Sequence, residues 1–291
     1  MGTLVVMTYP TSLFAKAADH TYVKCHTGGA AWGCWGGKSG GKTLRSGQGS
    51  TKRADKIAQP DEKANIKCYL VNGVCHQAAN RILLPADILV RGARGYSVSQ
   101  ALFGAYGRVG IWPCRSPFVQ HAGVTGDLTA CRQAAALSGR RARRRQRSEA
   151  DKLDYQYIRR ELEIYRGGAR MMRSGARSAA DASEAASLHL ALFMHMAEFN
   201  LGPMLDRGLA RRLKQVRRKT ERDRRKPEIA YESKEMNIEE FAGHFNELTL
   251  LFQTEMANSM NRDTYATLFD LDPDQQVILA DPQILGRVKR G

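Results

Sequence analysis

The sequence predicts an α+β fold for its first half and an all-α region for its second half. In the first half, short apolar runs are separated by glycine- and proline-containing turns, which is typical of mixed short strands and helices. From Glu149 onward, apolar residues recur at three- and four-residue steps, which indicates amphipathic helices. A run of arginines marks the change of character. We therefore predict an N-terminal domain over residues 1–137, an arginine-rich linker over 138–148 and a helical domain over 149–291.

The first half begins with two predicted strands, Thr3–Tyr9 and Thr21–Lys24. The glycine-laden stretch Thr27–Ser50 then favours turns and hairpin loops. A short helix follows over Thr51–Ala58, and Pro60 is expected to end it. Three further elements are predicted before the linker: an extended run over Asn65–Val71, a strand over Ile88–Val90 and a helix over Ser97–Tyr106.

The second half contains four long helical patterns, of which the last has the clearest apolar face. The predicted helices are Ala150–Tyr165, Asp181–Asn200, Pro203–Lys226 and Ile238–Met260. The apolar residues Val277–Leu279 are expected to fold back onto this bundle.

The chain of 291 residues is 43% hydrophobic, which places it among globular proteins, and its net charge is +16. This charge implies attraction to an acidic partner such as nucleic acid, an anionic envelope or an acidic protein. The candidate anion-binding side chains are those of the arginine run: Arg140, Arg141, Arg143, Arg144, Arg145 and Arg147. The same run is equally well interpreted as a solvated linker, because no nucleic-acid-binding motif accompanies it.

Cys75 is the residue on which a catalytic interpretation depends. It follows an Asn72-Gly73 turn and opens an amphipathic run that stops at Pro85. On the first turn of a helix, backbone N–H groups without helical partners and the positive end of the helix dipole favour a thiolate. Such a cysteine is a candidate nucleophile if a histidine folds next to it. A buried structural thiol is the alternative interpretation.

Two histidines compete for the role of general base. His76 is adjacent to Cys75 on the predicted helix, where neighbouring side chains point about 100° apart, so it is poorly placed. His20 opens the run Asp19–Cys25, and a strand can hold an imidazole rigidly enough to aim it at a thiolate. The sequence therefore predicts a dyad of Cys75 and His20.

The order of these residues resembles the circularly permuted members of the papain-like NlpC/P60 superfamily. The resemblance covers about residues 13–110 and depends on Asp19-His20-Thr-Tyr-Val and Asn72-Gly-Val-Cys75-His-Gln. It implies a papain-like N-terminal domain with Cys75 as nucleophile and His20 as base. Family members carry a third polar residue that orients the imidazole, and His26 is the only candidate for it here.

A second motif competes with this interpretation. Gly36–Thr43 matches the phosphate-binding loop pattern GxxxxGK[ST], with Gly36, Gly41, Lys42 and Thr43 at the required positions. A functional phosphate loop needs a strand before it and a helix after it, and the flanking glycine-rich segments predict neither. We expect a chance match and therefore no nucleotide cofactor.

The cysteine spacing and the absence of long apolar stretches bear on metal binding and on the location of the protein. All six cysteines lie within the first 131 residues and none forms a CxxC pair, so no metal site is predicted. No apolar stretch approaches the ~20 residues of a membrane helix, and the N-terminal residues lack the basic region of a secretory signal. We expect a chain made in the cytoplasm that reaches any external site through a secretion system that uses no cleavable signal.

Together these features predict a cysteine peptidase or amidase that acts through a thioester intermediate. A bacterial effector toxin that cleaves peptidoglycan or a host protein fits this combination, with the helical region binding an inhibitor or a delivery protein. Two alternatives remain: a non-enzymatic nucleic-acid-binding protein that uses the arginine run and the Arg207–Lys226 helix, and a nucleotide-binding protein that uses Gly36–Thr43.

Overall fold

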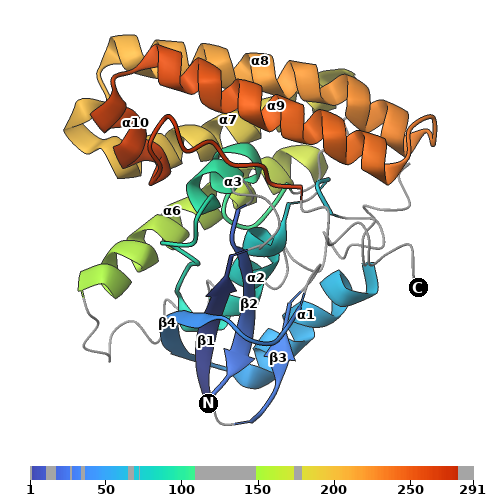
Figure 1. Ribbon diagram of the computed structural model, residues 1–291, viewed down its shortest axis with the longest axis vertical. Coiled ribbons are helices and arrows are strands. Elements are labelled where there is room, and N and C mark those ends of the chain that lie inside the picture. The colour runs from blue at the N-terminus through green and yellow to red at the C-terminus, as the bar shows by residue number, and fades with distance from the viewer. Residues whose placement is uncertain are drawn as a thin grey trace.

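The computed structural model describes residues 2–10, 18–26, 28–33, 37–64, 69–71, 73–108, 149–173 and 179–280. It has the α+β architecture expected from the sequence, with a small antiparallel sheet and helices stacked above it (Figure 1). The arginine run and the boundaries predicted at residues 137 and 148 lie outside the described residues.

The sheet contains the strands in the order β3-β2-β1-β4, and every pair is antiparallel. The two predicted N-terminal strands are confirmed as β1 and β2. The bounds of the strands are Gly2–Tyr9 for β1, His20–Cys25 for β2, Ala31–Trp32 for β3 and Lys42–Gly49 for β4. The prediction of turns throughout Thr27–Ser50 is wrong for β4, because pairing with β1 overrides the weak strand propensity of its glycines.

Three helices follow β4 in the first half of the chain; the first two pack against the sheet, and the third packs between the second and the helices of the second half. They are α1 (Thr51–Ala64), α2 (Cys75–Leu83, followed by the 3-10 turn η2, Leu84–Ala86) and α3 (Tyr96–Phe103). Helix α1 does not end at Pro60 as predicted but continues to Ala64.

The predicted strand over Ile88–Val90 is not formed. Side chains satisfy the backbone N–H groups that a neighbouring strand would otherwise bind. Leu89 N–H donates to Asp154 Oδ2 (3.3 Å) and Val90 N–H donates to Asn80 Oδ1 (2.9 Å). The segment is therefore buried as an extended loop between α2 and the helical half.

The second half of the chain forms helices that lie above and beside the sheet-containing part (Figure 1). They are α6 (Glu149–Arg173), α7 (Ala179–Leu201, continued by the 3-10 turn η4, Gly202–Met204), α8 (Arg207–Glu232), α9 (Ile238–Ser259) and α10 (Arg262–Phe269). The four helices predicted from the periodicity are all present. Helix α8 starts later than predicted because the Asp206 side chain accepts a hydrogen bond from Leu209 N–H and caps it.

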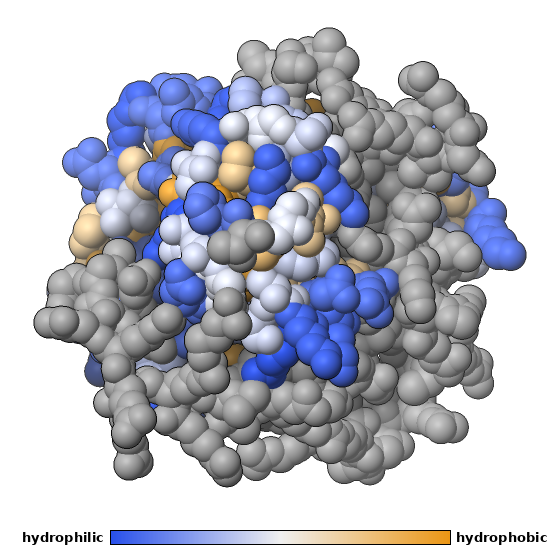
Figure 2. Space-filling view, turned by 90° about the horizontal axis from the view of Figure 1, so that it is seen from below, coloured by the Kyte–Doolittle hydropathy of each residue, from blue (hydrophilic) through white to orange (hydrophobic). Residues whose placement is uncertain are grey.

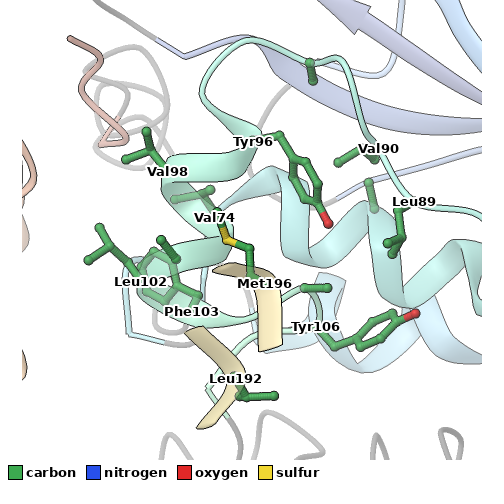
Figure 3. Packing of buried hydrophobic residues seen from close by; sticks show 14 of the residues in the cluster. Val74, Leu89, Val90, Tyr96, Val98, Leu102, Phe103, Tyr106, Leu192 and Met196 are labelled. Atoms are coloured by element: carbon green, nitrogen blue, oxygen red, sulfur yellow. The ribbon is translucent and has the colours of Figure 1, made fainter. Parts of the chain in front are cut away.

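Buried apolar side chains from both halves of the chain form one continuous cluster. Val74, which directly precedes Cys75, lies beside Met196 of α7, and Leu192 of α7 lies below Phe103 (Figure 3). Asp154 of α6 adds ionic links, because it pairs with Arg45 of β4 and with Arg91 (2.8 Å). The described helices of the second half therefore pack directly against the sheet-containing part of the chain.

The last described segment folds back onto the helical bundle, as predicted for Val277–Leu279. Gln253 of α9 both donates to Val277 O (2.7 Å) and accepts from Val277 N–H (2.9 Å). The segment then accepts two hydrogen bonds near the candidate site, from Ala18 N–H to Ile278 O (3.0 Å) and from the Tyr69 hydroxyl to Leu279 O (3.1 Å). The C-terminal segment thus fixes the residues that precede β2.

Seen from the side of the sheet, the described surface is mainly hydrophilic, with apolar residues in small separate patches (Figure 2). No helix in the described part of the chain is both long enough and apolar enough to cross a membrane.

Candidate active site

Cys75 is the first residue of α2, at the position expected from the sequence. The turn before it is tight, because Leu70 adopts a positive φ of 64° and its N–H donates to Gly73 O (2.9 Å). Gln77, fully buried, accepts a hydrogen bond from Val74 N–H (3.0 Å) and donates to Gly104 O (3.1 Å). These bonds fix the direction in which the helix begins and hence the position of the thiol.

Gly73 allows this turn to form. Its φ is +139°, and a Cβ atom placed on it would lie 2.7 Å from the Cβ of Gln77. We expect Gly73→Ala to destabilise the protein by about 2–4 kcal/mol, because it combines backbone strain with overpacking against a fully buried side chain. Chemical denaturation measures this change.

Gly243→Ala on α9 is the matched control for that experiment, because no atom lies within 4 Å of its Cβ position. It should leave stability unchanged or raise it by up to ~1 kcal/mol, since alanine has the higher helix propensity. Equal effects of the two substitutions would contradict the close packing described at Gly73.

The carbonyl oxygen of Asp19 is the point at which the candidate residues meet. Cys75 Sγ lies 3.8 Å from it and His76 Nε2 lies 2.9 Å from it. The carbonyl carbon of Asp19 is bonded to the backbone nitrogen of His20, the first residue of β2. A single peptide group therefore separates the Cys75 sulfur from the His20 backbone.

Asp19 is itself held firmly. Its N–H donates to Arg94 O (3.0 Å), and its carboxylate accepts from Arg94 N–H (3.1 Å) and from the Thr8 hydroxyl (3.5 Å). Thr8 lies on β1 and Arg94 lies in the loop before α3. Two parts of the fold thus position the residue whose carbonyl the thiol contacts.

His20 is 2% exposed and has aromatic neighbours. Its ring centroid lies 4.9 Å from that of Tyr9 and 6.4 Å from that of Tyr22. Strand alternation assigns these three residues to the sheet face opposite α2, whereas Val6 and Val23 belong to the cluster that also contains the apolar residues of α2. The Gly37–Gly41 segment lies over this face, because Tyr22 donates to Gly40 O (2.6 Å) and Tyr9 donates to Gly37 O (3.3 Å).

The Gly37 carbonyl fixes the tautomer of His20. His20 Nε2 lies 3.1 Å from Gly37 O. Because a carbonyl oxygen only accepts hydrogen bonds, Nε2 carries the proton and Nδ1 is the basic nitrogen of the neutral ring. The Tyr9 hydroxyl in turn accepts from Gly37 N–H (3.2 Å). The His20 ring is therefore oriented by a backbone carbonyl, whereas His26 is the only side chain that the sequence suggests for this role.

His26 does not orient His20. It follows the far end of β2, about 20 Å along the strand at ~3.3 Å per residue, and its side chain is exposed. The prediction that His26 is a possible third member is therefore wrong. A backbone carbonyl leaves no signature in the sequence, so inspection of polar side chains could not have found Gly37.

His76 has both of its ring nitrogens engaged. Nε2 donates to Asp19 O, and Nδ1 lies 2.9 Å from the Ser99 hydroxyl, whose single proton also lies within reach of Tyr96 O (2.8 Å). Complete burial lowers the pKa of His76 to about 3, against the smaller opposing effect of the Asp19 hydrogen bond. At neutral pH it is therefore an uncharged structural link between α2, α3 and the start of β2.

The phosphate-loop interpretation of Gly36–Thr43 is wrong. Gly36 lies outside the described residues, but Lys42 and Thr43 are in β4, paired with Thr8 and Met7 of β1. The Thr43 hydroxyl donates to the sulfur of Met7 (3.7 Å). A phosphate loop needs a helix N-terminus at this point, and an antiparallel strand does not provide one.

No group of three or more His, Cys, Asp or Glu side chains among the described residues is arranged to hold a metal ion.

Comparison of the chain with protein-family models, with curated proteins and with solved structures finds no match.

Proposed function

We propose that the protein is a cysteine hydrolase of the permuted NlpC/P60 type, a peptidase or amidase with Cys75 as nucleophile and His20 as general base. The observation that carries the proposal is the contact between Cys75 Sγ and the carbonyl oxygen of Asp19, the residue directly before His20. The contact joins a helix N-terminus to the start of an earlier strand, which is the order of base and nucleophile in that family.

The local chemistry supports these roles. The sulfur lies at the N-terminus of α2, where the helix dipole favours a negative charge. Because Gly37 O holds the proton of His20 on Nε2, Nδ1 is the nitrogen that accepts the thiol proton. The His20 ring lies with Tyr9 and Tyr22 on the sheet face opposite α2, so the proposal requires the ring to turn around the start of β2 and bring Nδ1 to the Cys75 sulfur.

The reaction then has two halves. The thiolate attacks an amide carbonyl, and the backbone N–H of Cys75 stabilises the oxyanion. His20 returns its proton to the leaving amine, so the C–N bond breaks and a thioester remains. Water, deprotonated by His20, attacks the thioester and releases the acid and the free thiol. The proposed substrate is a peptide bond in a protein or in the stem peptide of peptidoglycan, as an effector toxin would cleave.

Two measurements on the full chain test the proposal. Alkylation by iodoacetamide, followed by peptide mapping, should modify Cys75 at about pH 6 faster than the other five cysteines, because thiolate rather than thiol reacts. Release of dye from labelled casein or labelled peptidoglycan should fall at least ~10³-fold in Cys75→Ser and about 10²–10⁴-fold in His20→Ala.

Cys25→Ser is the matched control, because Cys25 is also a buried cysteine outside any disulfide and lies on β2. It should retain hydrolysis. If Cys75→Ser retains hydrolysis, or if His20→Ala leaves both the alkylation profile and the hydrolysis unchanged, the dyad is not catalytic.

A further inference from the structure

Helix α8 presents a continuous row of positive charges to solvent. Six of its basic residues follow one another at steps of four, three, four, four and three: Arg207, Arg211, Lys214, Arg218, Arg222 and Arg225. At 100° per residue, these steps keep all six within a sector about 80° wide, over a length of about 27 Å. We call this row the α8 stripe.

The stripe is separate from the packed sides of the helix. Leu213, Arg217 and Arg224 are buried and face the body of the protein. Two further basic residues of α8, Arg212 and Lys219, lie outside the stripe and contact α9. Arg212 donates to Ser259 O (3.0 Å), and Lys219 pairs with Glu255. In Figure 1, α8 lies in the layer furthest from the sheet.

Neutralising contacts along the stripe are sparse. Among the described ion pairs, Arg222 alone of the six has an acidic partner, its chain neighbour Asp223 at 3.7 Å. Five successive pairs of like charges at three- and four-residue spacing each destabilise the helix slightly. Apart from the Arg222–Asp223 pair, no ion pair among the described residues offsets this repulsion, but a bound polyanion would.

The chemistry of the stripe favours one kind of polyanion. Five of the six residues are arginine, whose planar guanidinium matches phosphate oxygens in a bidentate manner. The segment Arg207–Lys226 has no aromatic residue on which single-stranded bases could stack. A helix lying on a membrane needs a free apolar face, and the apolar face of α8 is already buried in the core.

We infer that the α8 stripe binds the phosphate backbone of duplex nucleic acid without regard to base sequence. At one base pair per ~3.4 Å, a stripe of about 27 Å follows about eight base pairs. This interaction does not depend on the proposed hydrolase activity, and it uses none of the residues of the candidate active site.

Fluorescence anisotropy tests the inference, with the full chain and two labelled DNA duplexes of unrelated sequence. The two duplexes should bind equally, and six phosphate contacts should weaken binding about 10³-fold between about 50 and 200 mM salt. The triple variant Arg211→Gln, Arg218→Gln, Arg225→Gln should raise Kd about 100-fold at about 100 mM salt. It should also reduce the slope of log K against log salt by about 3.

A matched control removes three exposed charges elsewhere: Lys52→Gln, Lys56→Gln and Arg160→Gln. Its Kd should stay within about threefold of the unsubstituted protein. Equal losses in the two triple variants would show a general charge effect, and an unaffected stripe variant would assign binding to other residues, so either result overturns the inference. Binding to phosphatidylserine vesicles that matches DNA binding and is lost in the stripe variant would also overturn it, in favour of a membrane surface.

Discussion

Arg224→Ala is expected to lower the free energy of unfolding by about 3–5 kcal/mol, the cost of breaking a buried ion pair by removing one partner. Arg224 is 1% exposed and pairs with Glu228, which is also buried. Its guanidinium lies over the rings of Phe103 (4.6 Å) and Phe245 (5.0 Å). Alanine would leave the Glu228 carboxylate buried with less compensation and would remove these contacts together.

The network around Arg224 connects the helical half to the turn before Cys75. Arg224 donates to Leu70 O (2.6 Å), and Arg108 pairs with both Glu228 and Glu221. Burial alone would raise the pKa of Glu221, but Arg108 and Arg217 outweigh burial and hold it well below its usual range. Glu221 is therefore charged at neutral pH, and the arginines are needed to keep it so.

Chemical denaturation of Arg224→Ala and Arg225→Ala gives a matched comparison, because Arg225 is the next residue and is exposed. Arg225→Ala should change stability by no more than about 0.5 kcal/mol. Similar losses in the two variants would contradict the burial of Arg224. Cys75 alkylation in Arg224→Ala should also accelerate, since the Leu70 turn loses its tie to α8.

Glu161→Gln is expected to remove a pH dependence of stability of about 3 kcal/mol. Glu161 is fully buried on α6, accepts a hydrogen bond from Ala105 N–H (2.6 Å) and lies beside Tyr157 and Tyr165. Burial raises the pKa of Glu161 from 4.5 to about 7, and the Ala105 hydrogen bond opposes this only in part. Glutamine keeps an acceptor for Ala105 and carries no charge.

The direction of this pH dependence of stability follows from proton linkage. Between pH 4.5 and about 7 the folded protein holds a proton on Glu161 that the unfolded chain releases. The contribution of this residue is therefore fully present below pH 4.5 and is lost as pH rises to about 7. Denaturation of the parent protein and of Glu161→Gln at about pH 5 and about pH 8 measures the difference. Glu163→Gln, a substitution at an exposed position two residues away, should have the same free energy of unfolding as the parent protein at both pH values. If the parent protein and Glu161→Gln change in stability equally between the two pH values, the prediction is contradicted.

Much of the secondary structure could be predicted from periodicity. The apolar spacing that predicts Ile238–Met260 corresponds to α9, and the strand-like run Thr3–Tyr9 corresponds to β1. Predictions failed where a tertiary partner decided the outcome. The glycine-rich residues 42–49 form a strand because β1 lies beside them, and residues 88–90 do not because Asn80 and Asp154 bind their N–H groups.

The candidate site was likewise predictable from the sequence only in part. The turn and periodicity predict a helix that begins near Cys75, and the structure starts α2 at that residue. Nothing in the sequence indicates that Asp19 O accepts from His76, or that Gly37 O holds the His20 ring, because every residue has a carbonyl group. Position in the fold alone distinguishes these two carbonyls from the others.

Sequence alone determined the elements that depend on local pattern: the fold class, the long helices, the helix start at Cys75 and the excess of positive charge. Tertiary structure alone decided which charges are buried. Within one basic helix, Arg217 and Arg224 are enclosed with Glu221 and Glu228, while Arg218 and Arg225 face water. Adjacent arginines are chemically identical, so only the packing of α8 against α3 and the turn before Cys75 separates structural ion pairs from a free binding surface.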